Sequence, residues 1–148
     1  MLSTLLKYFN VGILADASFS IKCGGPQMIS NGIVFEAENK TIGAATFNVA
    51  STQKWAVSNV GLFADRQNQQ YVQNTTEQVI STNTPELYQT SRLSPGSLRY
   101  YGLGLENGPY NVSLFFAEIG FPDRSTESSR SLARRVFDVY IQVIYRLK

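Results

Sequence analysis

The residues that could do acid–base chemistry in this sequence are carboxylates, because the chain has no histidine. Its absence excludes a Ser-His-Asp site and a cysteine–histidine nucleophile. Glu118 and Asp138 lie on two strongly alternating segments, and a glycosidase would need two such carboxyls about 5 to 9 Å apart in a cleft. A strand end and a polar strand face are ordinary surface positions, however. We therefore predict no catalytic residue and expect the chain not to be an enzyme.

The other reactive side chain is Cys23, the single cysteine of the chain. One cysteine cannot form an internal disulfide or a cysteine-rich zinc site. In a secreted protein, an odd cysteine is either a free thiol or half of a bond to another chain. We predict neither a metal site nor a cofactor.

Three asparagines lie in acceptor sequons for N-glycosylation, which require Asn-x-Ser or Asn-x-Thr. They are Asn39, Asn74 and Asn111. Asn39 and Asn74 lie in expected loops, and Asn111 lies on the polar face of an expected strand. All three are usable only if the chain enters the secretory pathway.

Composition suits one domain with its own core: the chain has 148 residues, of which 43% are apolar and only 16% charged. A net charge of +2 is too small to indicate nucleic-acid binding. No apolar run is long enough to span a membrane. Residues 8–14 form a short apolar run before Ala15-Asp16-Ala17, which has the small-x-small shape of a signal-peptide cleavage site. Asn10 and Gly12 interrupt that run.

The elements that position the carboxylates, the cysteine and the sequons are predicted from period-2 alternation, which is typical of half-buried strands. In 110–118, Tyr110, Val112, Leu114 and Phe116 share one face. In 136–143, Phe137, Val139, Ile141 and Val143 share one face. Weaker strands are expected at 19–23, 33–36, 46–49, 55–58, 86–89 and 98–103, with long loops at 64–85 and 120–134. Glycines at 24 and 25 predict a backbone turn after the first of these strands.

Seven runs in order resemble the malectin-like domain of plant leucine-rich-repeat receptor kinases. They are SIKCGGP (20–26), NGIVFE (31–36), KWAVSNVG (54–61), ELYQTSR (86–92), SLRYYGLGLENG (97–108), FFAE (115–118) and RRVFDVYI (134–141). The resemblance covers residues 18–142. Residues 1–17 form a divergent N-terminal segment, or a weak signal peptide, and 143–148 a divergent tail.

The resemblance implies an all-β, jelly-roll-like sandwich of the malectin or galactose-binding-like type. That family continues with further strands after position 142, so we expect this chain to lack the last strands. An unpaired sheet edge would then be exposed, which predicts marginal stability for the chain alone. Full-length relatives are serine/threonine kinases, but this chain has neither a Gly-rich loop nor a catalytic Asp motif.

Carbohydrate binding is the function that the resemblance implies, with an oligosaccharide or cell-wall glycan as partner. The candidate aromatics are Trp55, Tyr88, Tyr100, Tyr101 and Phe121. Leu93 and Gly120 stand where malectin itself has tyrosines, so its diglucose specificity is not expected. The alternative is a protein-contact module that binds co-receptor ectodomains or a peptide through the two long loops. Both functions place the chain outside the cell, at the plasma membrane or secreted, with no nucleic-acid partner.

Overall fold

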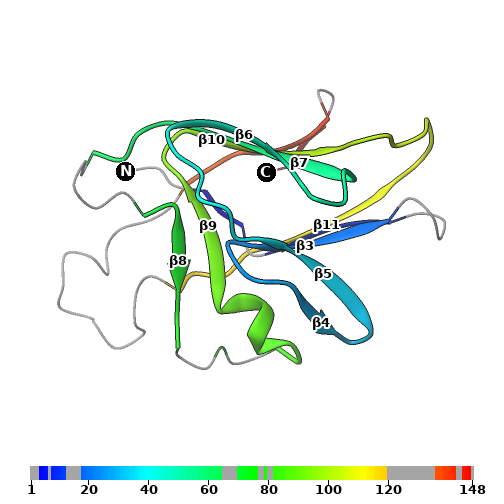
Figure 1. Ribbon diagram of the computed structural model, residues 1–148, viewed down its shortest axis with the longest axis horizontal. Helices are drawn as coiled ribbons and strands as arrows, with labels where there is room; N and C mark the ends of the chain where they lie inside the picture. Colours follow the sequence, from blue (N-terminus) through cyan, green and yellow to red (C-terminus); the bar gives the residue numbers. More distant parts are fainter. Residues whose placement is uncertain are drawn as a thin grey trace.

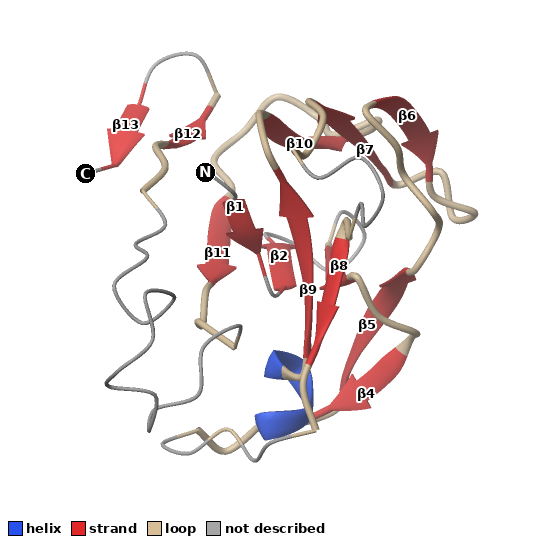
Figure 2. Cartoon of the chain, turned by 90° about the vertical axis from the view of Figure 1, so that its left-hand side faces the viewer, coloured by secondary structure: helices blue, strands red, loops and turns tan. Residues whose placement is uncertain are grey.

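The computed structural model describes residues 4–6, 8–12, 18–64, 70–76, 79, 82–119, 136–142 and 145–147. These residues form short β-strands and a single turn of 3-10 helix (Figures 1 and 2). The strands are β1 (Thr4–Leu6), β2 (Tyr8–Gly12), β3 (Phe19–Cys23), β4 (Met28–Ser30), β5 (Ile33–Glu38), β6 (Ala45–Val49), β7 (Trp55–Val60), β8 (Val72–Asn74), β9 (Thr90–Ser94), β10 (Ser97–Gly102), β11 (Asn111–Phe115), β12 (Val139–Ile141) and β13 (Tyr145–Leu147). The helix η1 spans Pro85–Tyr88.

Two sheets form the sandwich. One has the strand order β11-β2-β3-β5-β4, and the other has the order β10-β7-β6. Their facing sides bury one apolar core, to which β3 contributes Phe19, Ile21 and Cys23 while β7 contributes Trp55 and Val57. The all-β sandwich expected from the sequence is confirmed, with small, open sheets.

A third sheet, β1-β9-β8, flanks the sandwich (Figure 1). It encloses a second cluster made of Ile42, Phe63, Tyr71 and Leu93. A third cluster joins Phe35 of β5 to Leu87 of η1. The last two strands, β12 and β13, pair only with each other among the described residues.

The alternation expected in two strands is confirmed along 110–114 and 137–141, but Phe116, expected on the apolar face, is 38% exposed beyond the end of β11. In β11, Val112 and Leu114 are half-buried, while Asn111 and Ser113 are exposed. Along 137–141, the apolar residues are half-buried, and Asp138 and Tyr140 between them are exposed. A strand with one face toward the core shows this pattern, because successive side chains point to opposite faces.

The expected turn after β3 is also confirmed. Gly24 has φ +70°, and a Cβ there would lie 2.8 Å from the Ser91 carbonyl oxygen. At Gly25, a Cβ would lie 2.6 Å from Thr90 Oγ1. The first glycine supplies the left-handed backbone and the second allows β9 to approach closely.

Other expectations were wrong. The segment 86–89 is not a strand, because Pro85 fixes φ at the start of η1 and favours a helical turn there. The expected loop 64–85 contains β8, and residues 1–17 supply β1 and β2. The strands β4, β9 and β13 were also missed. In β9, Arg92 hid the pattern, because a charged residue in a short segment indicates exposure although this one is buried.

Candidate functional site

Two of the five candidate aromatics belong to the inside of the sandwich. Trp55 is only 3% exposed, and its Nε1 donates to Glu36 Oε2 at 2.8 Å. Tyr100 packs against the same core, 6.3 Å from the Trp55 ring, and its hydroxyl donates to Glu38 Oε2 at 3.5 Å. Trp55 therefore presents no free face on which a sugar could stack, and Tyr100 turns toward the core.

The other three candidates differ from one another in position. Tyr88 is half-buried against the Phe35–Leu87 cluster. Phe121 lies outside the described residues. Tyr101 is 37% exposed and points away from the core. The structure therefore does not bring the five candidates into one site, and Tyr101 is the described candidate with the most accessible ring.

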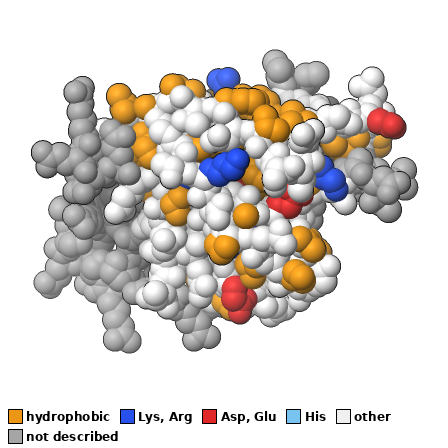
Figure 3. Space-filling view, viewed as in Figure 1, with side chains coloured by type: hydrophobic (Ala, Val, Ile, Leu, Met, Phe, Trp, Pro, Cys, Tyr) orange, Lys and Arg blue, Asp and Glu red, His pale blue; other side chains and the backbone are white. Residues whose placement is uncertain are grey.

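Tyr101 belongs to what we call the outer platform, the solvent-facing side of the β10-β7-β6 sheet. The register places Phe47, Ser58 and Arg99 in one cross-strand row and Val49, Ala56 and Tyr101 in the next. Residues paired across strands share a face. The platform also includes Val60 at the end of β7. In Figure 3, hydrophobic side chains gather in the upper part of the view, over β10, β6 and β7.

Two aromatic rings lie at the centre of the outer platform. Phe47 is 60% exposed, and its ring centroid lies 5.8 Å from that of Tyr101 in an edge-to-face arrangement. The Tyr101 hydroxyl and Ser58 Oγ are hydrogen-bonded at 3.1 Å. Sequence reasoning missed Phe47, although the alternation in 46–49 put it on the other face of the strand from Thr46 and Asn48. The available signal was an aromatic residue on the face that the strand turns to solvent.

The electrostatics of the outer platform are simple. The three strands contain no aspartate or glutamate, and their only charged residue is Arg99, which is exposed. Its guanidinium adds hydrogen-bond donors to the hydroxyls of Ser58 and Tyr101. The surface therefore combines apolar ring faces with several neutral or cationic donors.

A buried ion pair holds the sheets behind the platform in place. Arg92 meets the Glu38 carboxylate with two donors, Nε at 2.8 Å and Nη2 at 2.5 Å. The same carboxylate accepts the Gly24 amide at 2.8 Å. Burial raises the pKa of Glu38, while the Arg92 guanidinium opposes that shift by stabilising the anion. The pair connects β5, β9 and the turn after β3, so its role is structural.

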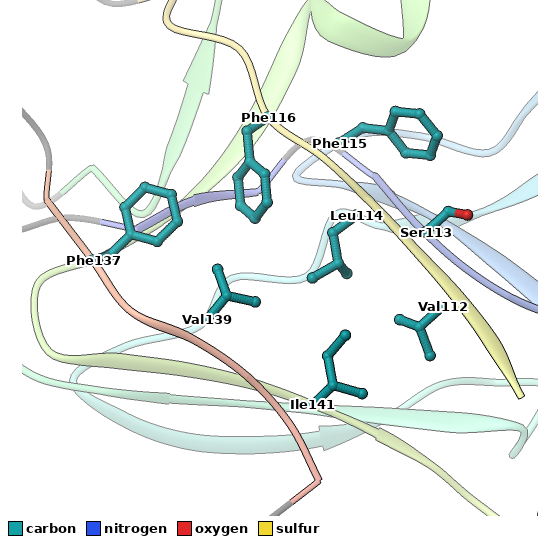
Figure 4. Close-up of a pocket in the computed structure, with 8 residues that line it drawn as sticks. All are labelled: Val112, Ser113, Leu114, Phe115, Phe116, Phe137, Val139 and Ile141. Carbon is teal, nitrogen blue, oxygen red and sulfur yellow. The ribbon is translucent and has the colours of Figure 1, made fainter. Parts of the chain in front are cut away.

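An apolar groove of about 550 Å³ lies between β11 and the segment that contains β12 (Figure 4). Its lining is dominated by Leu114, Phe116, Phe137 and Val139, and Figure 4 shows these side chains converging from the two segments. Ser113 brings the one hydroxyl of the lining. A sugar, which needs several hydrogen-bond partners, would be poorly served there.

The carboxylates considered for catalysis occupy the exposed positions expected of them. Glu118 and Asp138 are both exposed, and Asp138 Oδ2 accepts the Tyr140 hydroxyl at 3.4 Å. Within the described part of the chain, no group of three or more Cys, Asp or Glu residues is suited to hold a metal ion. Nor do those residues include a helix long and apolar enough to cross a membrane.

Comparison with known proteins gives a consistent result. The model of the malectin domain matches residues 17–147. Two probable LRR receptor-like serine/threonine-protein kinases of Arabidopsis thaliana are 49% and 48% identical to the chain over 132 residues, covering 88% of it. A third such kinase from the same plant is 39% identical over 128 residues. The chain spans only 13% of the length of the first two kinases. No solved structure gives a significant match.

Proposed function

The chain belongs to the malectin domain family, and from that premise we propose that it is a non-catalytic module that binds carbohydrate on its outer platform. The observation that carries the proposal is the pair of exposed, touching rings of Phe47 and Tyr101. Folding does not require large aromatic rings in water on a flat sheet face. Exposed apolar clusters of this kind mark binding surfaces.

The platform offers both kinds of contact that a sugar needs. The C–H face of a pyranose can lie on the ring of Tyr101 or Phe47, where the apolar face of the sugar loses contact with water. The hydroxyls of the sugar can bond to Ser58, to the Tyr101 hydroxyl and to the Arg99 guanidinium. Because Tyr101 and Ser58 are already hydrogen-bonded to each other, two of these three polar side chains are held in position before a sugar binds.

The same proposal assigns the module to the extracellular part of a receptor-like kinase. The relatives are named as LRR receptor-like kinases, and the matched segment is a small fraction of their length. A cell-wall glycan or a secreted oligosaccharide is the ligand that such a location would present. The sequence has no histidine, and Glu118 and Asp138 are both exposed. Both facts support a binding function without catalysis.

The test is binding of the secreted 148-residue chain to an array of plant cell-wall oligosaccharides, both neutral and acidic. We expect Tyr101→Ala and Phe47→Ala each to weaken binding tenfold or more, which corresponds to about 1.4 kcal/mol. The control is Ile29→Ala, because Ile29 is 68% exposed on β4, away from the platform. Wild-type binding in both platform variants would show that the sugar lies elsewhere.

Trp55 fluorescence is a poor reporter for this experiment, since Trp55 is buried on the inner side of β7. Binding is better followed by calorimetry or by retention on the array. A folded chain that retains none of the oligosaccharides would contradict the proposal as a whole.

A protein-contact module is the second candidate, favoured by one observation. Exposed apolar residues continue past the two aromatic rings to Val60 and Leu62, which are 52% and 56% exposed. A protein partner buries about 800 Å² on each side, far more than one sugar ring. Replacing Leu62, which lies beyond the end of β7, by serine would weaken the binding of a co-receptor ectodomain or peptide but leave oligosaccharide binding unchanged.

A further inference from the structure

We infer that Asn39, Asn74 and Asn111 each carry an N-linked glycan, and that these glycans leave the outer platform bare. All three asparagines are exposed, and so are the hydroxyl residues Thr41 and Thr76 and the Ser113 of the third sequon. None of the three lies on β6, β7 or β10. The inference concerns modification and does not depend on which ligand the platform binds.

The buried ion pair holds Asn39 outward. Glu38 is fixed by Arg92, whose Nη2 also donates to the Glu38 carbonyl at 2.8 Å and to the Lys40 carbonyl at 3.1 Å. The residues on both sides of Asn39 are therefore anchored to one buried guanidinium. Because Glu38 points into the protein, the next side chain points to solvent.

Asn74 lies on an edge strand. It is the last residue of β8, which among the described residues is one of the two edge strands of the β1-β9-β8 sheet. The following residue is held in place, because the Thr75 amide donates to the Gln89 carbonyl at 2.8 Å. A glycan on Asn74 therefore extends from a fixed backbone into solvent.

Asn111 opens β11, and its partner on the neighbouring strand β2 is Gly12. A glycine carries no side chain, so the space beside Asn111 on that sheet face is not filled by its cross-strand neighbour. The apolar residues Val112 and Leu114 point toward the core side. A glycan on Asn111 would thus leave the packing of β11 unchanged.

The modification is a group transfer from a lipid-linked oligosaccharide pyrophosphate, the donor that the secretory pathway supplies. A bond forms between the asparagine Nδ2 and the anomeric carbon of the first sugar, and Nδ2 loses a proton. The bond from that carbon to the pyrophosphate breaks, and the pyrophosphate leaves with the electron pair. The sequon hydroxyl is part of the sequence that the host transferase recognises.

The first experiment measures occupancy in the full chain secreted from a eukaryotic host. Peptide mass spectrometry should find a glycan on each asparagine, and Thr41→Ala, Thr76→Ala and Ser113→Ala should each remove one glycan. The matched control is Thr84→Ala, because Asn83-Thr84-Pro85 is not a sequon and the number of glycans should not change. Unmodified asparagines at 39, 74 and 111 in the secreted protein would overturn the inference.

The second experiment asks whether the platform is bare. Hydroxyl-radical labelling of Phe47 and Tyr101 should proceed equally before and after enzymatic removal of the glycans. Val49→Asn creates the sequon Asn-Ala-Ser on the platform itself, in the same cross-strand row as Tyr101, since Ser51 follows two residues later. Its glycan should slow the labelling of both rings, whereas Val49→Gln should not.

Labelling of Phe47 and Tyr101 that rises in the wild-type chain after deglycosylation would show that native glycans cover the platform. That result would overturn the second half of the inference while leaving the occupancy result in place. The oligosaccharide array is a separate readout, so failure of the proposed function and failure of this inference can be told apart.

Discussion

The two faces of the β10-β7-β6 sheet differ most clearly at Tyr100 and Tyr101, which are neighbours in the chain. Tyr100 points inward, packs beside Trp55 and donates to Glu38. Tyr101 points outward, contacts Phe47 and shares a hydrogen bond with Ser58. Both residues are part of the same family resemblance, but the sheet assigns them to different environments.

This difference separates residues that the fold needs from residues that it does not. On the inner face, polar groups bond to residues far along the chain: Trp55 to Glu36, Asn59 to the Gly43 carbonyl and Tyr100 to Glu38. On the outer platform, the rings of Phe47 and Tyr101 contact each other and are 60% and 37% exposed. Substitutions on the inner face should therefore lower stability, while those on the platform should change binding.

The largest effect is expected from breaking the buried ion pair. Arg92→Leu leaves the Glu38 carboxylate buried without its cation, which should lower the free energy of unfolding by about 3 to 5 kcal/mol. The matched control, Arg99→Leu on the platform, should change it by less than about 0.5 kcal/mol. Urea denaturation followed by Trp55 fluorescence measures both. Equal losses in the two variants would remove the distinction between the buried interior and the outer platform.

The tyrosine pair gives a second, smaller contrast. Tyr100→Ala removes a packed ring and a hydrogen bond to Glu38, and should cost about 2 to 3 kcal/mol of stability. Tyr101→Ala should cost less than about 1 kcal/mol, because its ring is partly solvated. Oligosaccharide binding should show the reverse order when measured at a temperature where both variants are folded. A Tyr101→Ala variant that is unstable yet binds oligosaccharide normally would contradict the distinction between the two faces.

The buried lysine Lys22 should make the stability of the protein depend on pH. Lys22 of β3 donates from Nζ to the Glu86 and Leu87 carbonyls at 2.7 and 2.6 Å. Burial lowers the pKa of Lys22 to about 8 from 10.5. Between these values the unfolded chain binds more protons than the folded one, so the contribution of Lys22 to stability rises with pH.

The measurement is the free energy of unfolding of the wild type minus that of Lys22→Met, from pH 7 to 11. We expect this difference to be constant below pH 8, to increase through pH 8 to 10.5, and then to level off. Taking the difference cancels other groups that titrate at alkaline pH. A flat profile would show that Lys22 is no more desolvated than a surface lysine.

The smallest effect is expected at Cys23, which should not react in the native state. Its side chain is fully buried, and burial, reinforced by the nearby Glu38 charge, raises the pKa of the thiol. Since the thiolate is the reactive species, a disulfide reagent at pH 8 should label Cys23 only after unfolding. Rapid labelling of folded protein would place the thiol outside the core.

Several features followed from local pattern. The strand 19–23 was predicted with the bounds of β3, and the alternation along 110–116 separated Val112 and Leu114 from Asn111 and Ser113 as observed. Local pattern failed at β9 because Arg92 is buried by a partner 54 residues away. It also failed at 86–89, where a proline outweighed the apolar residues that follow it.

The sequence alone determined the family, the all-β class and the positions of the sequons, because these depend on residue identity, order and period-2 alternation. Only the tertiary structure decided which aromatic rings are available. Trp55 proved to be a core residue, Tyr100 packs against that core, and Phe47 is exposed beside Tyr101. The physical reason is that a strand has two faces, and only packing against a second sheet decides which of them is removed from water.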